Sequence, residues 1–387
     1  MKVSKLKDCC TIIAGQSPES KYYNSNGDGL PFFQGKADFG ELYPSIRVYC
    51  SQPTKIAEKD DILLSVRAPV GPTNLAPCKV CIGRGLTAIR PSEVLLTRYV
   101  LLFFRHFEAQ LASRGTGTTF KAITQDVVKN LEIPIPPLSE QERIVARIEE
   151  LFSQLDAGVE TLKKTKAQLA VYRQAVLKEA FEGDYPRKQL KEFSKAISGF
   201  AFKSSRYSPN GNYVVVKIGN VKERHFDFSR DLTKTLEADD SILEKYLLRR
   251  GDCLITLTGS RGKRDYGFVA MVGNQNNYLL NQRVAALRFD QSVALPEFFQ
   301  YYLASPSYRD MFFGYETGNV GQGNVGIKAL LDPYVILPDI DTQKRIVEDV
   351  EDRLSVCDSI EQTVDTALQQ AEAMRQSILK EAFEGRL

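Results

Sequence analysis

The 387-residue chain is predicted to fold as two globular domains of mixed α/β (α+β) type that alternate with two long helices. Three observations predict this architecture. The heptapeptide LKEAFEG at 177–183 recurs unchanged at 379–385, 202 positions later. Upstream of each copy, apolar residues recur with the seven-residue period of a coiled coil. The composition, 43% hydrophobic and 26% charged, is that of a folded globular protein.

The first globular block, residues 1–138, contains short strand-like segments. Apolar stretches such as Ile62–Val66 are separated by glycine, asparagine and proline turns, which is typical of β-strands. A short helix is expected near 97–113. The block therefore predicts a compact domain that mixes strands with a little helix.

The first long helix is predicted over residues 139–183. Ser139 and Glu142 form a capping box at its start, and Gly183 suits the cap at its end. Steps of four and three residues pass through ten positions, eight of them apolar. These heptad positions are Ile144, Ile148, Leu151, Leu155, Gly158, Leu162, Thr165, Leu169, Tyr172 and Val176.

The second globular block, residues 184–340, is a distant copy of the first. Three short phrases recur at offsets that grow from 184 to 191 to 198, so core strands are shared while loops differ in length. Strands are expected at Tyr213–Ile218 and Phe268–Val272, and a helix near 296–312. The matching phrases are Leu6–Asp8 with Leu190–Glu192, Asp61–Ser65 with Asp252–Thr256, and Ala88–Arg90 with Ala286–Arg288.

The second long helix is predicted over residues 341–387, with Asp341 at its start and Gly385 at its end. The phrase Gln-x-Arg-Ile-Val, which begins at Gln141, returns at Gln343. Only Arg353 breaks the heptad frame. Since neither helix is stable alone in water, the two apolar seams are expected to bury each other, which makes the halves of the chain pseudo-twofold equivalents. The frame is Ile346, Val350, Arg353, Cys357, Ile360, Val364, Ala367, Ala371, Met374 and Ile378.

Composition excludes several other classes of protein. The longest apolar run, Tyr99–Phe104, is far shorter than the ~20 residues of a membrane span. The first ten residues show no apolar signal-peptide core, so a cytoplasmic location is expected. Seven cysteines are an odd number and favour reduced thiols. Cys78 and Cys81 form one C-x-x-C, but a structural zinc site normally has two spaced pairs, and whether these two bind metal stays open.

Charge is distributed unevenly along the chain. The net charge is only +3. The two helices at 139–182 and 341–384 carry −7, and the remainder therefore carries +10. Basic globular blocks beside acidic helices are expected if the blocks contact a polyanion and the helices contact protein.

Polar, basic, glycine-bearing loops are the expected DNA contacts, because Lys and Arg bind phosphates while Arg, Asn and Gln recognise base edges. Solvated turns are the alternative for any single residue. Four stretches carry most of the candidates: 65–71, 114–121, 256–264 and 321–328. The candidate residues are Lys36, Arg67, Arg84, Arg114, Thr118, Thr119, Lys121, Lys203, Arg261, Lys263, Arg264, Gln282, Gln322, Asn324 and Lys328.

Two formal motif matches do not predict chemistry. Gly321-x-Gly323-x-x-Gly326 has the spacing of a dinucleotide fingerprint, but no strand-like segment precedes it. Asp332-Pro333-Tyr334 is similar to the catalytic motif of adenine methyltransferases, but it lacks one proline and a glycine-rich cofactor loop, and is expected to open a strand. No Walker motif or nuclease carboxylate set is present, so no catalytic residue, cofactor site or metal site is assigned.

The alternation of duplicated blocks and helices resembles the specificity subunit of type I restriction-modification enzymes. The segment IPIPPLSEQ at 133–141 and the AFEG that closes both helices carry the resemblance. The second lead-in, LPDIDTQ at 337–343, departs from the pattern. The resemblance implies two target-recognition domains, each reading half of a bipartite double-stranded DNA sequence, held apart by an antiparallel helix pair.

The family also implies that the chemistry resides in other subunits. Methylation subunits, expected in two copies, would dock on the helices and bring S-adenosylmethionine, and a restriction subunit would bring ATP- and magnesium-dependent cleavage. Flanking helix residues are candidates for the partner contact, with capping and solvation as the alternative. These candidates are Glu140, Gln141, Arg143, Gln343 and Arg345.

Two rival functions remain open at this stage. A coiled-coil scaffold without DNA binding would explain the helices, and an autonomous methyltransferase would require transfer of methyl groups by the chain alone. The target sequence, the spacer length and the presence of a cognate restriction subunit are not encoded in any recognisable motif.

Overall fold

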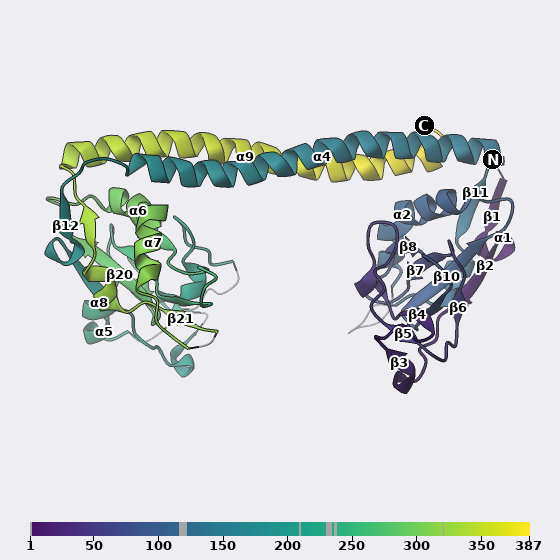
Figure 1. The fold of residues 1–387 in the computed structure, drawn as a ribbon, viewed down its shortest axis with the longest axis horizontal. Coiled ribbons are helices and arrows are strands. Elements are labelled where there is room, and N and C mark those ends of the chain that lie inside the picture. The colour runs from purple at the N-terminus through teal and green to yellow at the C-terminus, as the bar shows by residue number, and fades with distance from the viewer. Residues whose placement is uncertain (1, 116–121, 209, 230–233, 236–237, 320) are drawn as a thin grey trace. The chain divides into compact units, whose positions relative to one another are not determined.

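The computed structural model describes residues 2–115, 122–208, 210–229, 234–235, 238–319 and 321–387 (Figure 1). It divides into two compact units. Unit 1 comprises Met1–Lys163 and Asp365–Leu387, and unit 2 comprises Lys164–Val364. Each unit therefore holds one globular domain together with parts of both long helices.

The described residues of the globular domain of unit 1 form short strands and three helices. Strand Ile62–Ser65 and helix Thr97–Ser113 agree with the sequence prediction. The strands are β1 Lys2–Lys5, β2 Cys10–Ala14, β3 Tyr23–Asn24, β4 Leu30–Phe33, β5 Tyr49–Cys50, β6 Ile56–Ala57, β7 Ile62–Ser65, β8 Thr73–Leu75, β9 Val80–Ile82, β10 Leu86–Pro91 and β11 Glu132–Ile135. The helices are α1 Leu6–Cys9, α2 Thr97–Ser113 and α3 Gln125–Lys129, with 3-10 turns at Ser20–Tyr22 and Lys36–Asp38.

The globular domain of unit 2 has a related order of strands and helices, with added elements such as α5 and α7. Its strands are β12 Arg187–Gln189, β13 Ser194–Ser198, β14 Tyr213–Val216, β15 Lys234–Thr235, β16 Cys253–Thr256, β17 Thr258–Gly259, β18 Val269–Met271, β19 Tyr278–Leu280, β20 Val284–Phe289, β21 Gly323–Asn324 and β22 Tyr334–Ile336. Its helices are α5 Asp240–Tyr246, α6 Pro296–Ala304, α7 Pro306–Gly314 and α8 Ile327–Leu331, with 3-10 turns at Leu190–Glu192, Ser204–Arg206 and Ile218–Asn220.

The single helix predicted near 296–312 is in fact two helices. Pro306 has no N–H to continue the hydrogen-bond ladder. Ser305 instead caps the second helix, since its hydroxyl oxygen accepts the Tyr308 N–H at 3.4 Å. The prediction of one helix was wrong at this point.

The two domains share three features of their sheets. A four-stranded antiparallel sheet has the order β2-β10-β7-β8 in unit 1 and β13-β20-β16-β18 in unit 2. A second, mixed sheet contains the parallel pair β4–β9 or β14–β19. The first and last strands of each domain also pair, β1 with β11 and β12 with β22.

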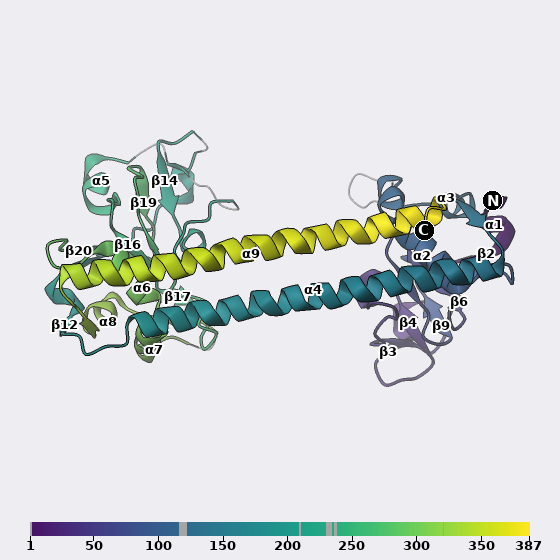
Figure 2. The same cartoon turned by 90° about the horizontal axis from the view of Figure 1, so that it is seen from above.

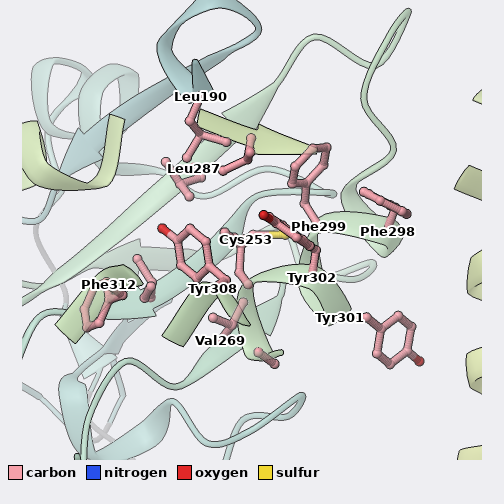
Figure 3. Packing of buried hydrophobic residues seen from close by; sticks show 14 of the residues in the cluster. Leu190, Cys253, Val269, Leu287, Phe298, Phe299, Tyr301, Tyr302, Tyr308 and Phe312 are labelled. Carbon is pink, nitrogen blue, oxygen red and sulfur yellow. The ribbon is translucent and has the colours of Figure 1, made fainter. Parts of the chain in front are cut away.

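The larger core cluster of each domain lies between the four-stranded sheet and the helices that cover it, and a smaller cluster lies between that sheet and the mixed sheet. In unit 2 the rings of Phe298, Phe299 and Tyr302 pack on sheet residues such as Cys253 and Leu287 (Figure 3). In unit 1, Tyr99 and Phe103 of α2 occupy the corresponding cluster. Aromatic side chains bury large apolar surfaces, so these rings help to hold helix to sheet.

The two long helices are α4, Leu138–Ala180, and α9, Ile340–Phe383 (Figure 2). They run antiparallel inside each unit. In unit 1, Arg143 donates to the Leu387 carbonyl oxygen at 3.1 Å and Arg375 pairs with Asp156. In unit 2, Arg173 pairs with Glu361 at 2.6 Å, and the later residue Glu179 pairs with the earlier Arg353 at 2.8 Å.

The predicted heptad seam is buried along only part of its length. Ile148, Val176 and Val350 are fully buried, and each joins the core cluster of its own unit's globular domain. Tyr172 and Met374 are exposed. The seams therefore bury against the domains as well as against each other, which the heptad alone did not predict.

The N-terminal caps of the two long helices differ from the predicted ones. At α9 the cap is Asp339, whose carboxylate accepts the Thr342 N–H at 2.8 Å, and not Asp341. At α4 the helix has already begun at Leu138, so Ser139 lies in its first turn. Gly385 adopts the left-handed conformation with φ +76° expected of a C-terminal glycine.

Candidate nucleic-acid interface

Three turns meet beside the end of β7 in unit 1. The Val66 N–H donates to the Gly85 carbonyl oxygen at 3.0 Å, and the Val66 carbonyl oxygen accepts the Ile123 N–H at 3.0 Å. The loop after β7, the turn between β9 and β10, and the segment before α3 are therefore adjacent. We refer to this meeting of Val66, Gly85 and Ile123 as the three-turn junction.

Unit 2 contains the same junction. The Leu257 N–H donates to the Arg283 carbonyl oxygen at 2.9 Å, and the Leu257 carbonyl oxygen accepts the Val325 N–H at 2.9 Å. These residues follow their counterparts by 191, 198 and 202 positions, offsets that also separate the repeated sequence phrases. The junction is thus part of the duplicated core, and the loops that project from it differ.

Three of the predicted DNA-contacting residues surround one cleft at the unit 1 junction. Lys36, Arg67 and Arg84 line a cleft of about 250 Å³ together with Gln34 and Ser65. All three cations are exposed. The three exposed guanidinium and ammonium groups make this cleft locally cationic, which favours the approach of an anion.

The other unit 1 candidates flank this cleft or lie outside the described part of the chain. Arg114 is exposed at the end of α2. The backbone of Arg67 forms an isolated antiparallel β-bridge with that of Ala122. This bridge places the predicted 65–71 loop beside the end of the predicted 114–121 stretch. Thr118, Thr119 and Lys121 lie outside the described residues.

In unit 2 the two predicted loops lie side by side. Strands β17 and β21 pair antiparallel, and the Thr258 hydroxyl donates to the Asn324 side-chain oxygen at 3.1 Å. Arg261 donates to the Gly318 carbonyl oxygen at 2.8 Å. Arg264 pairs with Asp310 at 2.5 Å, which offsets its charge. The remaining candidates are exposed: Lys203, Lys263, Gln282, Gln322 and Lys328.

Arg309 is a residue that sequence reasoning missed. Its guanidinium donates to the carbonyl oxygens of Arg264, Tyr266 and Gly267 at 2.9, 3.1 and 2.8 Å. Burial lowers its pKa. Arg309 therefore braces the base of the 261–267 loop, and no local motif could signal this because the contact spans more than forty residues.

Two of the predicted partner-contact residues are buried and unavailable to another protein. Gln141 and Gln343 are each 0% exposed. Their amides bond to backbone groups of the same unit. The prediction of a partner role was wrong for both, because a helix pattern cannot show what a distant loop covers.

Glu140, Arg143 and Arg345 remain at the surface. Glu140 pairs with Arg143 at 2.7 Å, and this hydrogen bond lowers the pKa of the Glu140 carboxyl. Arg345 donates to the Thr342 hydroxyl at 2.9 Å. These contacts are local, and the partner role of the three residues stays a prediction.

The formal motif matches have ordinary structural roles. Gly323 and Asn324 form strand β21, and Pro333 directly precedes strand β22, as expected for Asp332-Pro333-Tyr334. Within the described ranges, no group of three or more His, Cys, Asp or Glu side chains could hold a metal. Cys81 is buried in β9, and Cys78 is partly exposed outside it. No described helix is both long and apolar enough to cross a membrane.

Comparisons with known proteins agree along nearly the whole chain. The family model of the type I restriction modification DNA specificity domain matches residues 1–170 and 182–370. A protein of Methanocaldococcus jannaschii named as the type I restriction enzyme MjaX specificity subunit is 40% identical over 167 residues. That match covers 43% of this chain and 38% of the MjaX protein. The EcoKI specificity subunit of Escherichia coli K12 is 27% identical over 332 residues, covering 80% of this chain and 70% of that protein.

Solved structures share the fold. A chain from a study of complex assembly and conformational transition of the type I R-M system superposes with a TM-score of 0.77 at 20% identity, covering 100% of this chain and 98% of that one. The HsdS subunit of Thermoanaerobacter tengcongensis gives 0.56 at 21% identity, covering 100% and 97%. The family match over two long segments, one for each globular domain, places this chain in the family of type I restriction-modification DNA specificity subunits.

Proposed function

We propose that each globular domain reads one half of a bipartite DNA target through its three-turn junction, and that the long helix pair sets the spacer between the halves. One observation carries this proposal. The same junction occurs in both domains, and exposed cationic and amide side chains lie beside it, which include Lys36, Arg67 and Arg84 in one and Gln282, next to Arg283, in the other. Two equivalent reading surfaces in one chain suit two half-sites.

The two half-sites should differ in sequence. Arg84 and Gln282 occupy equivalent turns, 198 positions apart. Arginine pairs best with guanine, and glutamine pairs best with adenine. The proposal therefore predicts an asymmetric target, with different base preferences beneath the two turns.

We further propose that this chain is non-catalytic and works with other subunits. Its family supplies specificity, so methylation subunits would bring S-adenosylmethionine, and a restriction subunit would bring ATP- and magnesium-dependent cleavage. The exposed helix faces around Glu140, Arg143 and Arg345 are the proposed docking region for methylation subunits.

The proposal is tested first by mapping modified adenines in the host genome with and without this gene. A bipartite motif that disappears with the gene supplies the target. Binding of the full-length chain to that duplex should then weaken steeply with salt, and Arg67→Ala should weaken binding through the first half-site. Arg147→Ala, on an exposed face of α4, is the control.

Two other experimental results would instead support the rival functions. Salt-independent or undetectable DNA binding would indicate a scaffold protein. Methyl transfer by the purified chain alone would indicate an autonomous methyltransferase.

A further inference from the structure

A buried glutamine lies at the start of each long helix. Gln141 and Gln343 are 202 positions apart, within the repeated Gln-x-Arg-Ile-Val phrase, and both are fully buried. Burying a primary amide is costly unless its hydrogen-bonding groups are satisfied. The recurrence of this residue at both sites therefore calls for a specific role.

Each glutamine ties together two backbone segments, one before its own long helix and one before the neighbouring short helix. The Gln141 side-chain oxygen accepts the Leu96 N–H at 2.8 Å, and its amide nitrogen donates to the carbonyl oxygens of Val94 and Pro136 at 2.8 and 2.9 Å. Gln343 makes the equivalent bonds to Leu295, Val293 and Pro338 at 2.8, 2.8 and 2.7 Å. Both amide hydrogens are used in each case.

These bonds join the long helix to the helix that begins beside it. Leu96 directly precedes α2, and Leu295 directly precedes α6. Neither helix has a side-chain cap of its own at this position. The glutamine therefore fixes the start of α2 to the start of α4 in unit 1, and the start of α6 to the start of α9 in unit 2.

The short helices α2 and α6 also make aromatic contacts with the second long helix of their unit or with the residue just beyond its end. In unit 1, the Tyr99 ring of α2 lies 5.1 Å from Phe383 of α9. In unit 2, the Phe298 ring of α6 lies 5.4 Å from Phe181, just beyond the end of α4. Each globular domain is thus held by a directional polar contact on one long helix and by an apolar contact near the other.

We propose that Gln141 and Gln343 are positioning residues for spacer selectivity, each holding its reading domain in one fixed pose on the long helices. This inference rests on the proposed function. One extra base pair displaces a half-site by about 3.4 Å and rotates it by roughly 34°. A rigidly held domain cannot follow that rotation, whereas a domain held only by apolar packing can turn at lower cost.

The test uses the double variant Gln141→Met/Gln343→Met in the full-length chain. Methionine preserves most of the side-chain volume and removes the three hydrogen bonds. Gln154→Met, exposed on α4, is the matched control. Affinity is measured for duplexes carrying both half-sites at the natural spacer, at one base pair fewer and at one more, and for a single-base mismatch in each half-site.

The wild type and the control should prefer the natural spacer by about tenfold or more, the scale of a single mismatched base pair. The double variant should lose at least about threefold of that preference, while its discrimination against half-site mismatches stays unchanged. An unchanged spacer preference overturns the inference even if the melting temperature falls, because the glutamines would then contribute only stability. A parallel loss of mismatch discrimination also overturns it.

Two further measurements keep the outcome decisive. If the double variant does not fold, each single variant is measured in the same way, and amide exchange of Leu96 or Leu295 should accelerate in the folded single variant. A wild type that binds its half-sites without any spacer preference would contradict the ruler role of the helices in the proposed function. Wild-type spacer preference that persists in the variants would contradict only the role of the glutamines.

Discussion

At the scale of single residues, the two globular domains share a buried aspartate that pairs with an arginine, although their sequences are only weakly similar. Asp61 is 3% exposed and forms a two-point contact with Arg90 at 2.8 and 2.7 Å. Asp252 forms the same contact with Arg288 at 2.7 Å. The pairs join neighbouring strands of the four-stranded sheets. The repeated phrases at Asp61, Arg90, Asp252 and Arg288 are therefore explained by a structural ion pair, and not by a DNA contact.

Each aspartate also accepts a backbone N–H, from Glu58 or Arg249, at 2.8 Å. The hydrogen bond to aspartate raises the pKa of the Arg90 guanidinium. Since the carboxylate satisfies two different groups, its loss leaves both without a partner.

We expect Asp61→Ala to lower the free energy of unfolding by about 2 kcal/mol, because Arg90 and the Glu58 N–H lose their acceptor. The value is below that of a fully buried pair, since Arg90 keeps partial access to water. Urea denaturation followed by circular dichroism measures the change. Asp28→Ala, at an exposed carboxylate, should have almost no effect, and an equal loss in both variants would disprove the structural role of the pair.

At the scale of elements, the long helices were predictable and several of their contacts were not. The repeat and the heptad placed the start of each helix within one residue and its end within four residues of the observed position, because a seven-residue period is a local property of the sequence. The burial of Gln141 depends on Val94 and Leu96, which lie more than forty residues earlier in the chain. The break at Ser305 depends on a single proline inside an otherwise helical pattern.

The candidate DNA-binding surface of unit 1 also combines residues that could be predicted with an arrangement that could not. Sequence composition selected Lys36, Arg67 and Arg84 one by one, and every candidate in the described ranges is exposed apart from the two buried glutamines and the partly exposed Glu140. Their gathering around one cleft follows from the parallel pairing of β4 with β9 and the pairing of β7 with β10. Such long-range pairing has no local signal, so the site as an assembly could not be predicted.

The 261–267 loop of unit 2 gives a test at this scale. Arg309→Met removes three hydrogen bonds from the base of the loop while keeping an apolar stem against Phe313. We expect about tenfold weaker binding through the second half-site, since a displaced side chain forfeits its base or phosphate contact. Binding through the first half-site should be unchanged.

Competition assays with duplexes altered in one half-site at a time separate these two effects. Arg187→Met, at an exposed position in β12, is the control. Equal weakening of binding through both half-sites would show that the variant damages the protein generally. Arg309 would then have no specific role in DNA recognition by unit 2.

At the scale of the whole molecule, duplication explains why a chain of modest net charge can contact a polyanion. The +3 of the full sequence combines −7 on the long helices with +10 elsewhere. Each domain brings its own junction, and each long helix contributes to both units. A change within one domain should therefore alter one half-site, whereas a change in the helices between the units should alter only the relation between half-sites.

Insertion of one helical turn after Leu162 of α4 tests this separation. Leu162 lies next to the division between the units at Lys163 and Lys164. One turn adds about 5.4 Å, more than the ~3.4 Å rise of a base pair, so the preferred spacer should lengthen by at least one base pair. Selection from a duplex library with randomised spacer length measures the shift. Because neither three-turn junction is altered, both half-site sequences should stay the same, and a change in either of them would contradict the assignment of reading to the domains and of spacing to the helices.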